Sequence, residues 1–114
     1  CVDIYNPKTI RSTMGSLYRV PFIYVESLPD TICQLKDRGI HFYAAHLKGK
    51  GFYDEESYKE PTAFLIGNEG NGLTDELSEK AKQHIKIPME GQLESLNAAV
   101  AAAILMYEAS RQRR

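Results

Sequence analysis

Apolar and polar positions alternate along the chain in blocks that predict short buried strands separated by helices. Residues 40–46 and 62–66 are almost continuously apolar, as expected of strands covered on both faces of a parallel sheet. A third short run, residues 85–87, ends at Pro88, which has no backbone N–H to donate to a neighbouring strand. Residues 20–25 are rich in β-branched and aromatic side chains and predict a further short strand.

Helix signals lie between these runs. An Asn-Pro pair predicts a helix over residues 6–16, because asparagine suits the N-cap and proline the first helical position. A second helix is predicted to begin after Ser27 and to end before Gly39. A third is predicted to begin after Thr74 and to reach about Gln83. The alternation of strands and helices indicates an α/β domain whose parallel sheet is flanked by helices, and we expect a single domain over residues 1–114.

Residues 48–60 are polar, contain two glycines and show no period, which predicts a loop. The last helix is different, because residues 98–107 are apolar on every side and predict a buried helix. This run is well short of the roughly 18–20 residues that cross a bilayer, so it does not predict a membrane segment. Three polar residues, Glu94, Ser95 and Asn97, lie at its entrance, and Ser95 is the expected N-cap. Burying them without partners would cost roughly 1–3 kcal/mol each, so we expect them to meet one another or a ligand.

Composition excludes few functions. The net charge is −1, so no global basic field indicates nucleic-acid binding, although arginines cluster at the C-terminus. The two cysteines, Cys1 and Cys33, lack the spacing of a metal site or a redox motif, which predicts free thiols in a reducing cytoplasm. His41 and His46 would face opposite sides of one strand and His84 is isolated, so no metal site is expected.

In parallel sheets, ligands gather at the carboxyl ends of the strands. Three predicted strand ends fit this description: residues 44–46, residues 67–72 and residues 88–97. We expect them to converge on one pocket. The glycine-rich residues 67–74 carry Leu73 where a nucleoside-triphosphate loop requires lysine, so that chemistry is rejected. A structural turn and a binding loop both remain open there, and from the residues alone the ligand is unknown.

Two longer stretches, read together, resemble a known family. FLIGNEGNGL (residues 64–73) and IKIPMEGQLESLNAAVAAAILMYEASRQR (residues 85–113) closely resemble the second and third motifs of the SpoU branch of the SPOUT RNA methyltransferases. The opening NPKTIRSTMGSLYRVPF (residues 6–22) resembles the segment that this family carries after its first motif. The resemblance covers essentially the whole chain.

This resemblance implies an α/β fold with a deep C-terminal trefoil knot, a homodimer, and S-adenosylmethionine bound between the knot loops. The implied reaction transfers the cofactor's methyl group to a ribose 2′-hydroxyl of tRNA or rRNA. Backbone contacts to the cofactor are implied for Gly67, Ile87 and Leu96. The other residues implied to line the same pocket are Ala44, Ala45, Asn68, Glu69, Gly70, Met89 and Asn97. The implied catalytic residues, which would order the loop and the acceptor site, are Glu69, Ser95 and Asn97.

The chain departs from the family in one respect. It lacks the first motif, N-x-G-x-x-x-R, whose arginine is usually assigned to activating the 2′-hydroxyl. We therefore expect this chain to be a C-terminal part of a longer enzyme, without its first strand and helix and weakly active alone. The alternative is a non-catalytic RNA-binding or dimerisation module that retains the fold. Methylation of a base instead of a ribose is disfavoured by the third motif.

Overall fold

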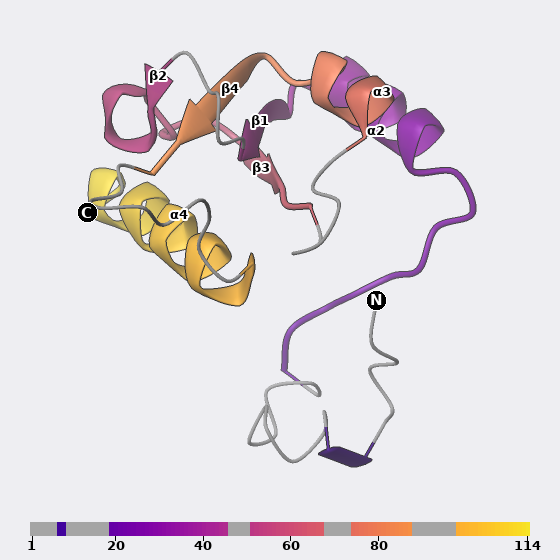
Figure 1. Cartoon of the computed structure of the whole chain (residues 1–114), viewed down its shortest axis with the longest axis horizontal. Coiled ribbons are helices and arrows are strands. Elements are labelled where there is room, and N and C mark those ends of the chain that lie inside the picture. Colours follow the sequence, from indigo (N-terminus) through magenta and orange to yellow (C-terminus); the bar gives the residue numbers. More distant parts are fainter. Residues whose placement is uncertain (1–6, 9–18, 46–50, 68–73, 88–97) are drawn as a thin grey trace.

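The computed structural model describes residues 7–8, 19–45, 51–67, 74–87 and 98–114. Within them, a four-stranded sheet is covered by helices on both faces (Figure 1). Its strand order is β2-β4-β1-β3, and every neighbouring pair is parallel. The strands are β1 (His41–Ala45), β2 (Gly51–Phe52), β3 (Thr62–Leu65) and β4 (Gln83–Lys86). The predicted parallel α/β sheet is therefore confirmed.

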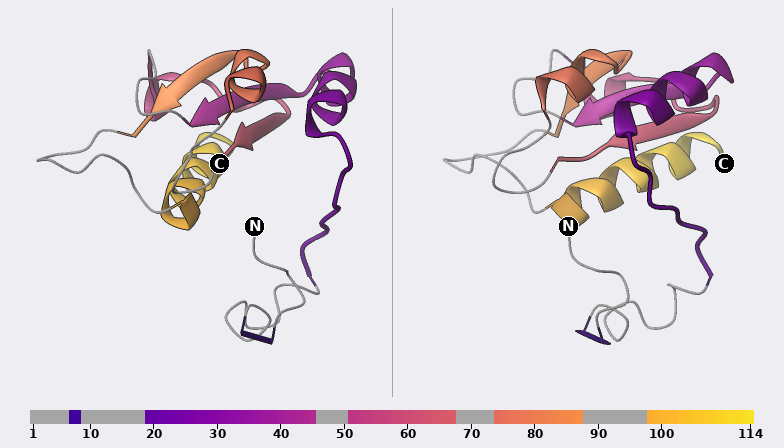
Figure 2. Two further views of the ribbon diagram at one scale, coloured as in Figure 1. Left: turned by 45° about the vertical axis from the view of Figure 1, so that its right-hand side comes forward. Right: turned by 90° about the vertical axis from the view of Figure 1, so that its right-hand side faces the viewer.

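Successive side chains of β1 point to opposite faces of the sheet, so two separate cores form. Phe42 and Ala44 pack with Ile32 of α2 (Leu28–Asp37) and with Leu65 of β3. On this side α2 lies beside α3 (Asp75–Glu79), as Figure 1 and Figure 2 both show.

The second core lies on the other face of the sheet. Tyr43 of β1 packs there with Tyr58, with Ile85 of β4 and with Leu105 of α4 (Ala98–Gln112). Figure 2 shows α4 on the side of the sheet opposite α2. The apolar runs predicted as strands thus owe their continuity to burial on two sides.

The signals that begin and end α2 act as predicted. The Ser27 hydroxyl accepts a hydrogen bond from the Asp30 backbone N–H at 3.4 Å. Gly39, just beyond the helix, has φ +90°, a conformation that side chains with a Cβ rarely adopt. Residues 7–8 are helical, but the rest of the helix predicted over residues 6–16 lies outside the described residues.

Helix α3 begins as predicted and ends sooner. The Thr74 hydroxyl accepts a hydrogen bond from the Leu77 backbone N–H at 3.3 Å. The helix stops at Glu79, and the Lys82 N–H donates to the Phe42 carbonyl at 2.7 Å, which brings the chain into the sheet. Gln83, predicted to end the helix, is therefore the first residue of β4.

The segment predicted as a loop, residues 48–60, contains regular structure and a core residue. Its described part forms β2 and a 3-10 turn over Tyr53–Glu55. Tyr58 is fully buried, with its ring 5.1 Å from the ring centroids of both Tyr43 and Phe64. Because most of this segment is polar, its composition did not indicate that Tyr58 is a core residue.

The strand predicted over residues 20–25 does not form. These residues lie exposed beside the domain, with Ile23 82% exposed. Their β-branched side chains favour extended backbone, but no strand of the described sheet pairs with them.

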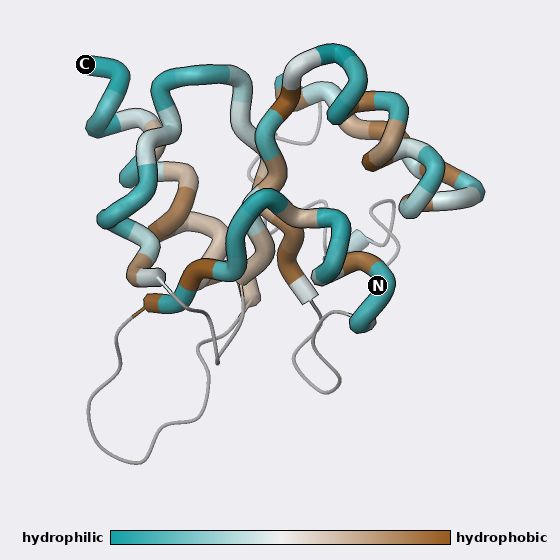
Figure 3. Tube along the Cα trace, turned by 90° about the horizontal axis from the view of Figure 1, so that it is seen from above, coloured by the Kyte–Doolittle hydropathy of each residue, from teal (hydrophilic) through white to brown (hydrophobic). Residues whose placement is uncertain are grey.

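Helix α4 runs to Gln112, close to the expected end, but is not buried all round. Met106 is 60% and Tyr107 65% exposed, because the sheet covers only one face of the helix. Figure 3 accordingly shows hydrophobic and hydrophilic positions mixed along the helices. No helix of the described residues is long and apolar enough to cross a membrane.

Candidate functional site

The parallel strands bring the predicted strand ends to one edge of the sheet. Ala45 is aligned with Ile85, Ala44 with Leu65, and Phe52 with Lys86. All four strands therefore end on the same side, which we call the carboxyl edge. This is the place where parallel sheets bind ligands.

Three of the predicted cofactor-binding residues lie at the carboxyl edge. Ala45 is the last residue of β1, Gly67 follows the end of β3, and Ile87 follows the end of β4. Each is half-buried, and Ala45 and Ile87 pack against the core on the α4 side. The sequence therefore placed these three residues together correctly, whereas their contact with a cofactor stays a prediction.

Ala44 differs from these three. Its side chain is fully buried and packs in the core formed with Ile32 of α2. Since that methyl group faces away from the edge, only the backbone of Ala44 is suited to contact a ligand there.

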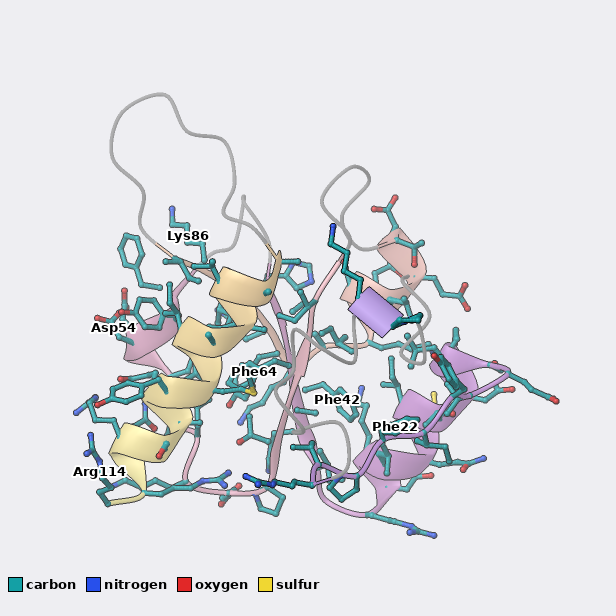
Figure 4. The ribbon with its side chains drawn as sticks, turned by 90° about the horizontal axis from the view of Figure 1, so that it is seen from below. Phe22, Phe42, Asp54, Phe64, Lys86 and Arg114 are labelled. Atoms are coloured by element: carbon teal, nitrogen blue, oxygen red, sulfur yellow. The ribbon has the colours of Figure 1, made fainter. Side chains whose placement is uncertain are left out.

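The remaining predicted site residues lie outside the described residues; they are Asn68, Glu69, Gly70, Met89, Ser95, Leu96 and Asn97. The expected knot also involves this part of the chain and stays a prediction. Helix α4 begins at Ala98, directly after the polar group at its entrance. Figure 4 shows the first turns of α4 on the side of Lys86, and Arg114 at the opposite end.

A groove of about 650 Å³ runs between β3 and α4. It extends from Ile66, next to the carboxyl edge, to Arg114 at the end of the helix. Its wall is apolar apart from a few polar residues; the lining residues are Thr62, Phe64, Ile66, Ala102, Met106, Ala109, Ser110, Arg113 and Arg114. Ile66 forms the end of the groove nearest the carboxyl edge, and its side chain is apolar.

The two histidines that the structure describes, His41 and His84, have different partners. His41 lies 2.8 Å from the carboxylate of Glu60, and the His84 ring nitrogen lies 2.7 Å from the Ser78 carbonyl. His84, isolated in the sequence, is therefore held by the backbone of α3. Among the described residues no group of three or more histidine, cysteine or acidic side chains could hold a metal ion.

The perturbed ionisable groups lie in the scaffold around α4. Hydrogen bonds from Arg111 and then Gln112 lower the pKa of Glu108 to about 2. The same pairing raises the pKa of Arg111. Burial, followed by the charge of Glu56, raises the pKa values of Tyr43 and Tyr58. These groups lie where the end of α4 meets residues 53–60, which we call the Tyr58 segment.

Sequence reasoning missed one feature of the carboxyl edge. The ammonium of Lys86 lies over the ring of Phe52, 5.0 Å from its centroid. Phe52 is 39% exposed. The pairing depends on the register between β2 and β4, and no local pattern could have indicated it because β2 was taken for a loop.

The comparison with protein families decides the assignment. The model of the SpoU rRNA Methylase family matches residues 1–107. The chain belongs to this family. The resemblance inferred from the two motif stretches is thereby confirmed.

Curated relatives carry related names. The chain is 41% identical over 105 residues to the 23S rRNA (guanosine(2553)-2′-O)-methyltransferase RlmP of Bacillus subtilis, covering 92% of this chain and 42% of that protein. It is 34% identical over 112 residues to an uncharacterized tRNA/rRNA methyltransferase of Synechocystis, covering 98% of this chain and 41% of that protein. The chain thus spans less than half the length of these relatives.

Solved structures share the fold. The SpoU methyltransferase AviRb of Streptomyces viridochromogenes, in complex with the cofactor AdoMet, superimposes with a TM-score of 0.90 at 35% identity, covering 99% of this chain and 47% of AviRb. The TrmH/SpoU tRNA modifying enzyme of A. aeolicus gives a TM-score of 0.85 at 36% identity, covering 91% of this chain and 53% of that enzyme. The sheet and helices described above are those of SpoU methyltransferases.

Proposed function

We propose that the protein carrying this chain transfers a methyl group from S-adenosylmethionine to a ribose 2′-hydroxyl of tRNA or rRNA in the cytoplasm. The observation that carries the proposal is the convergence of Ala45, Gly67 and Ile87 on the carboxyl edge, each at the end of a different strand. Family membership and the RNA methyltransferase names of the relatives support it.

The described edge fits the cofactor. Pairing within the sheet ends at Leu65 in β3 and at Lys86 in β4, so the backbone of Gly67 and of Ile87 lies beyond the paired region. An adenine ring needs backbone donors and acceptors beside an apolar wall, and the side chains of Ile66 and Ile87 supply such a wall. We assign backbone contacts to Gly67, Ile87 and Leu96. The rest of the proposed pocket is Ala44, Ala45, Asn68, Glu69, Gly70, Met89 and Asn97.

Catalysis in this proposal rests on positioning. S-adenosylmethionine supplies, when bound, a methyl group already activated by its sulfonium. The chain must then hold the ribose hydroxyl in line with that group, which lowers the barrier chiefly through orientation. We assign Glu69, Ser95 and Asn97 to ordering the acceptor side. Removal of the proton from this weakly nucleophilic hydroxyl requires a base or a nearby cation, and we propose that an arginine like that of the family's first motif supplies the cation in the intact protein.

The expected knot and homodimer complete the proposal. Threading of residues 88–97 through a knot would hold Met89, Leu96 and Asn97 against the strand ends. A homodimer is proposed from the family resemblance, and light scattering on the intact protein tests it, with a monomer as the contradicting result.

Calorimetry with S-adenosylhomocysteine tests the cofactor assignment in the intact protein. We expect binding by the wild type, loss of binding in Asn97→Ala, and normal binding in Gln34→Ala, a control on the exposed side of α2. Absence of binding by the wild type would overturn the proposal. Methylation is measured in parallel as ribose that resists alkaline cleavage in bulk tRNA and rRNA. Cofactor and RNA binding without methylation would favour the non-catalytic module.

A further inference from the structure

An exposed aromatic ring and a cation lie together at the carboxyl edge. Phe52 and Lys86 are aligned with each other at the last paired positions of β2 and β4. The Lys86 ammonium lies 5.0 Å from the centroid of the Phe52 ring, and the ring remains 39% exposed. The other phenylalanines of the described sheet, Phe42 and Phe64, pack within the two cores. Phe52 is therefore the sheet phenylalanine that offers a face to solvent.

The pair lies next to the proposed methyl-donor pocket. Lys86 directly precedes Ile87, whose backbone we assign to the cofactor. Neighbouring strands lie about 5 Å apart and residues advance about 3.3 Å along a strand, so Phe52 is within one nucleotide of that pocket. A group bound on the ring would thus lie close to the proposed cofactor pocket.

The chemistry of the pair suits single-stranded RNA. Aromatic rings stack on unpaired bases, and lysine neutralises a phosphate. We propose that Phe52 and Lys86 form a nucleotide-positioning site. In this site the Phe52 ring stacks on the base of the nucleotide adjacent to the methylated one, and Lys86 contacts the phosphate of that adjacent nucleotide. This inference rests on the proposed function and extends it to the substrate side.

Nearby acidic groups limit the extent of the site. Asp54 and Glu55 follow Phe52 in the 3-10 turn, and both are exposed. Figure 4 shows Asp54 on the same side of the molecule as Lys86, but further from the carboxyl edge. Their negative charges would repel RNA phosphates. The bound RNA is therefore expected to run along the carboxyl edge and away from this turn.

The structure provides a matched control pair. The guanidinium of Arg114 lies 5.6 Å from the centroid of the Tyr107 ring, which is also exposed. This pair has the same chemistry but lies at the far end of α4 (Figure 4). A general preference of RNA for exposed aromatic-cation pairs would involve both pairs, whereas a positioning site at the edge involves only Phe52 and Lys86.

The test uses the intact protein with bulk tRNA and rRNA purified from cells that lack its gene. For Phe52→Ala we expect the KM for RNA to rise roughly tenfold, within the range measured for loss of one stacked base, with S-adenosylhomocysteine affinity unchanged. Phe52→Tyr should restore the wild-type KM. Lys86→Met should weaken RNA binding and reduce its salt dependence by about one phosphate contact. Tyr107→Ala should leave the KM unchanged.

Phe52→Leu guards against misfolding, because leucine keeps the apolar volume but offers no ring face. It should raise the KM as Phe52→Ala does, at an unchanged melting temperature. An unchanged KM in Phe52→Leu, or an equal effect of Tyr107→Ala, would overturn the inference while leaving the methyltransferase proposal intact. Failure of the wild type to bind S-adenosylhomocysteine or to methylate RNA would overturn both.

Discussion

The two faces of the sheet differ in the chemistry of the side chains buried against them. The α2 face, formed by Ile32, Phe42, Ala44 and Leu65, is a core of apolar side chains. The α4 face contains two buried tyrosines, Tyr43 and Tyr58, beside Ile85 and Leu105. The buried cluster on the α2 face is entirely apolar, whereas the cluster on the α4 face carries hydroxyl groups that need partners.

The partners explain the difference. The Tyr43 hydroxyl donates to the Ser57 carbonyl at 3.3 Å, and the Tyr58 hydroxyl donates to the Tyr53 carbonyl. The end of α4 adds further bonds to the same segment through Gln112 and Arg113. The α4 face thus fixes residues 53–60, which have almost no regular structure, to the sheet. Polar groups in a core here organise a segment that burial alone would leave undefined.

The largest effect is expected on the α2 face. Phe42→Ala removes a buried ring and should lower the free energy of unfolding by about 3–5 kcal/mol, measured by urea denaturation. Phe22→Ala, at an exposed position, should cost less than about 0.5 kcal/mol. Equal effects of the two changes would contradict the placement of Phe42 in a sealed core.

A smaller effect is expected from Gln112→Ala at the end of α4. Its side chain accepts from the Tyr58 N–H at 2.6 Å and donates to the Glu56 carbonyl at 2.8 Å and to Glu108 at 3.0 Å. Loss of these bonds should cost roughly 2–3 kcal/mol and speed proteolysis between residues 53 and 60. Gln34→Ala on α2 serves as the control. Unchanged proteolysis would show that the tyrosines alone hold the segment.

Tyr58→Phe isolates the hydroxyl from the ring. The ring contacts with Tyr43 and Phe64 remain, and the bond to the Tyr53 carbonyl is lost. We expect a loss of about 1–2 kcal/mol in the free energy of unfolding. Tyr24→Phe, at an exposed tyrosine, should change it by less than about 0.5 kcal/mol. Equal losses for the two variants would show that the buried Tyr58 hydroxyl contributes no more to stability than an exposed hydroxyl does.

The smallest effect depends on pH and is confined to the α4 face. Arg111 donates to both carboxylate oxygens of Glu108, at 2.6 and 2.8 Å, and this holds the Glu108 pKa at about 2, below its ordinary 4.5. A lowered pKa in the folded state means that the stabilisation is complete above about pH 5 and is lost as the pH falls toward 2. Melting temperatures should therefore fall less steeply with acid in Glu108→Gln than in the wild type. Glu76→Gln, at an exposed position of α3, should keep the wild-type slope.

The sequence predicted the α2 face better than the α4 face for a physical reason. Local signals were sufficient for β1, β3 and the caps at Ser27 and Thr74, because apolar continuity and side-chain caps act over a few residues. The Tyr58 segment is fixed by Gln112, 54 residues away, and no local pattern encodes that bond. The exposed face of α4 was also missed, because composition does not reveal how many sides of a helix the sheet covers.

The same distinction between local signals and long-range pairing applies to the candidate site. Gly67 and Ile87 could be placed at one edge from the order of apolar runs, since parallel strands end on the same side. Phe52 and Lys86 could not, because their pairing requires the register of a two-residue strand within a polar segment. Residues 20–25 show the converse error, a strong β propensity without a partner in the described sheet.

The strand order has a consequence for how the chain folds. In the order β2-β4-β1-β3, no strand lies beside the strand that precedes or follows it in the chain. A hairpin between consecutive strands therefore cannot serve as a starting point, and every pairing must first close a long loop. During synthesis β1 can pair with β3 early, whereas β2 must wait for β4. Phe52 and Lys86 thus come together in one of the last steps of sheet assembly.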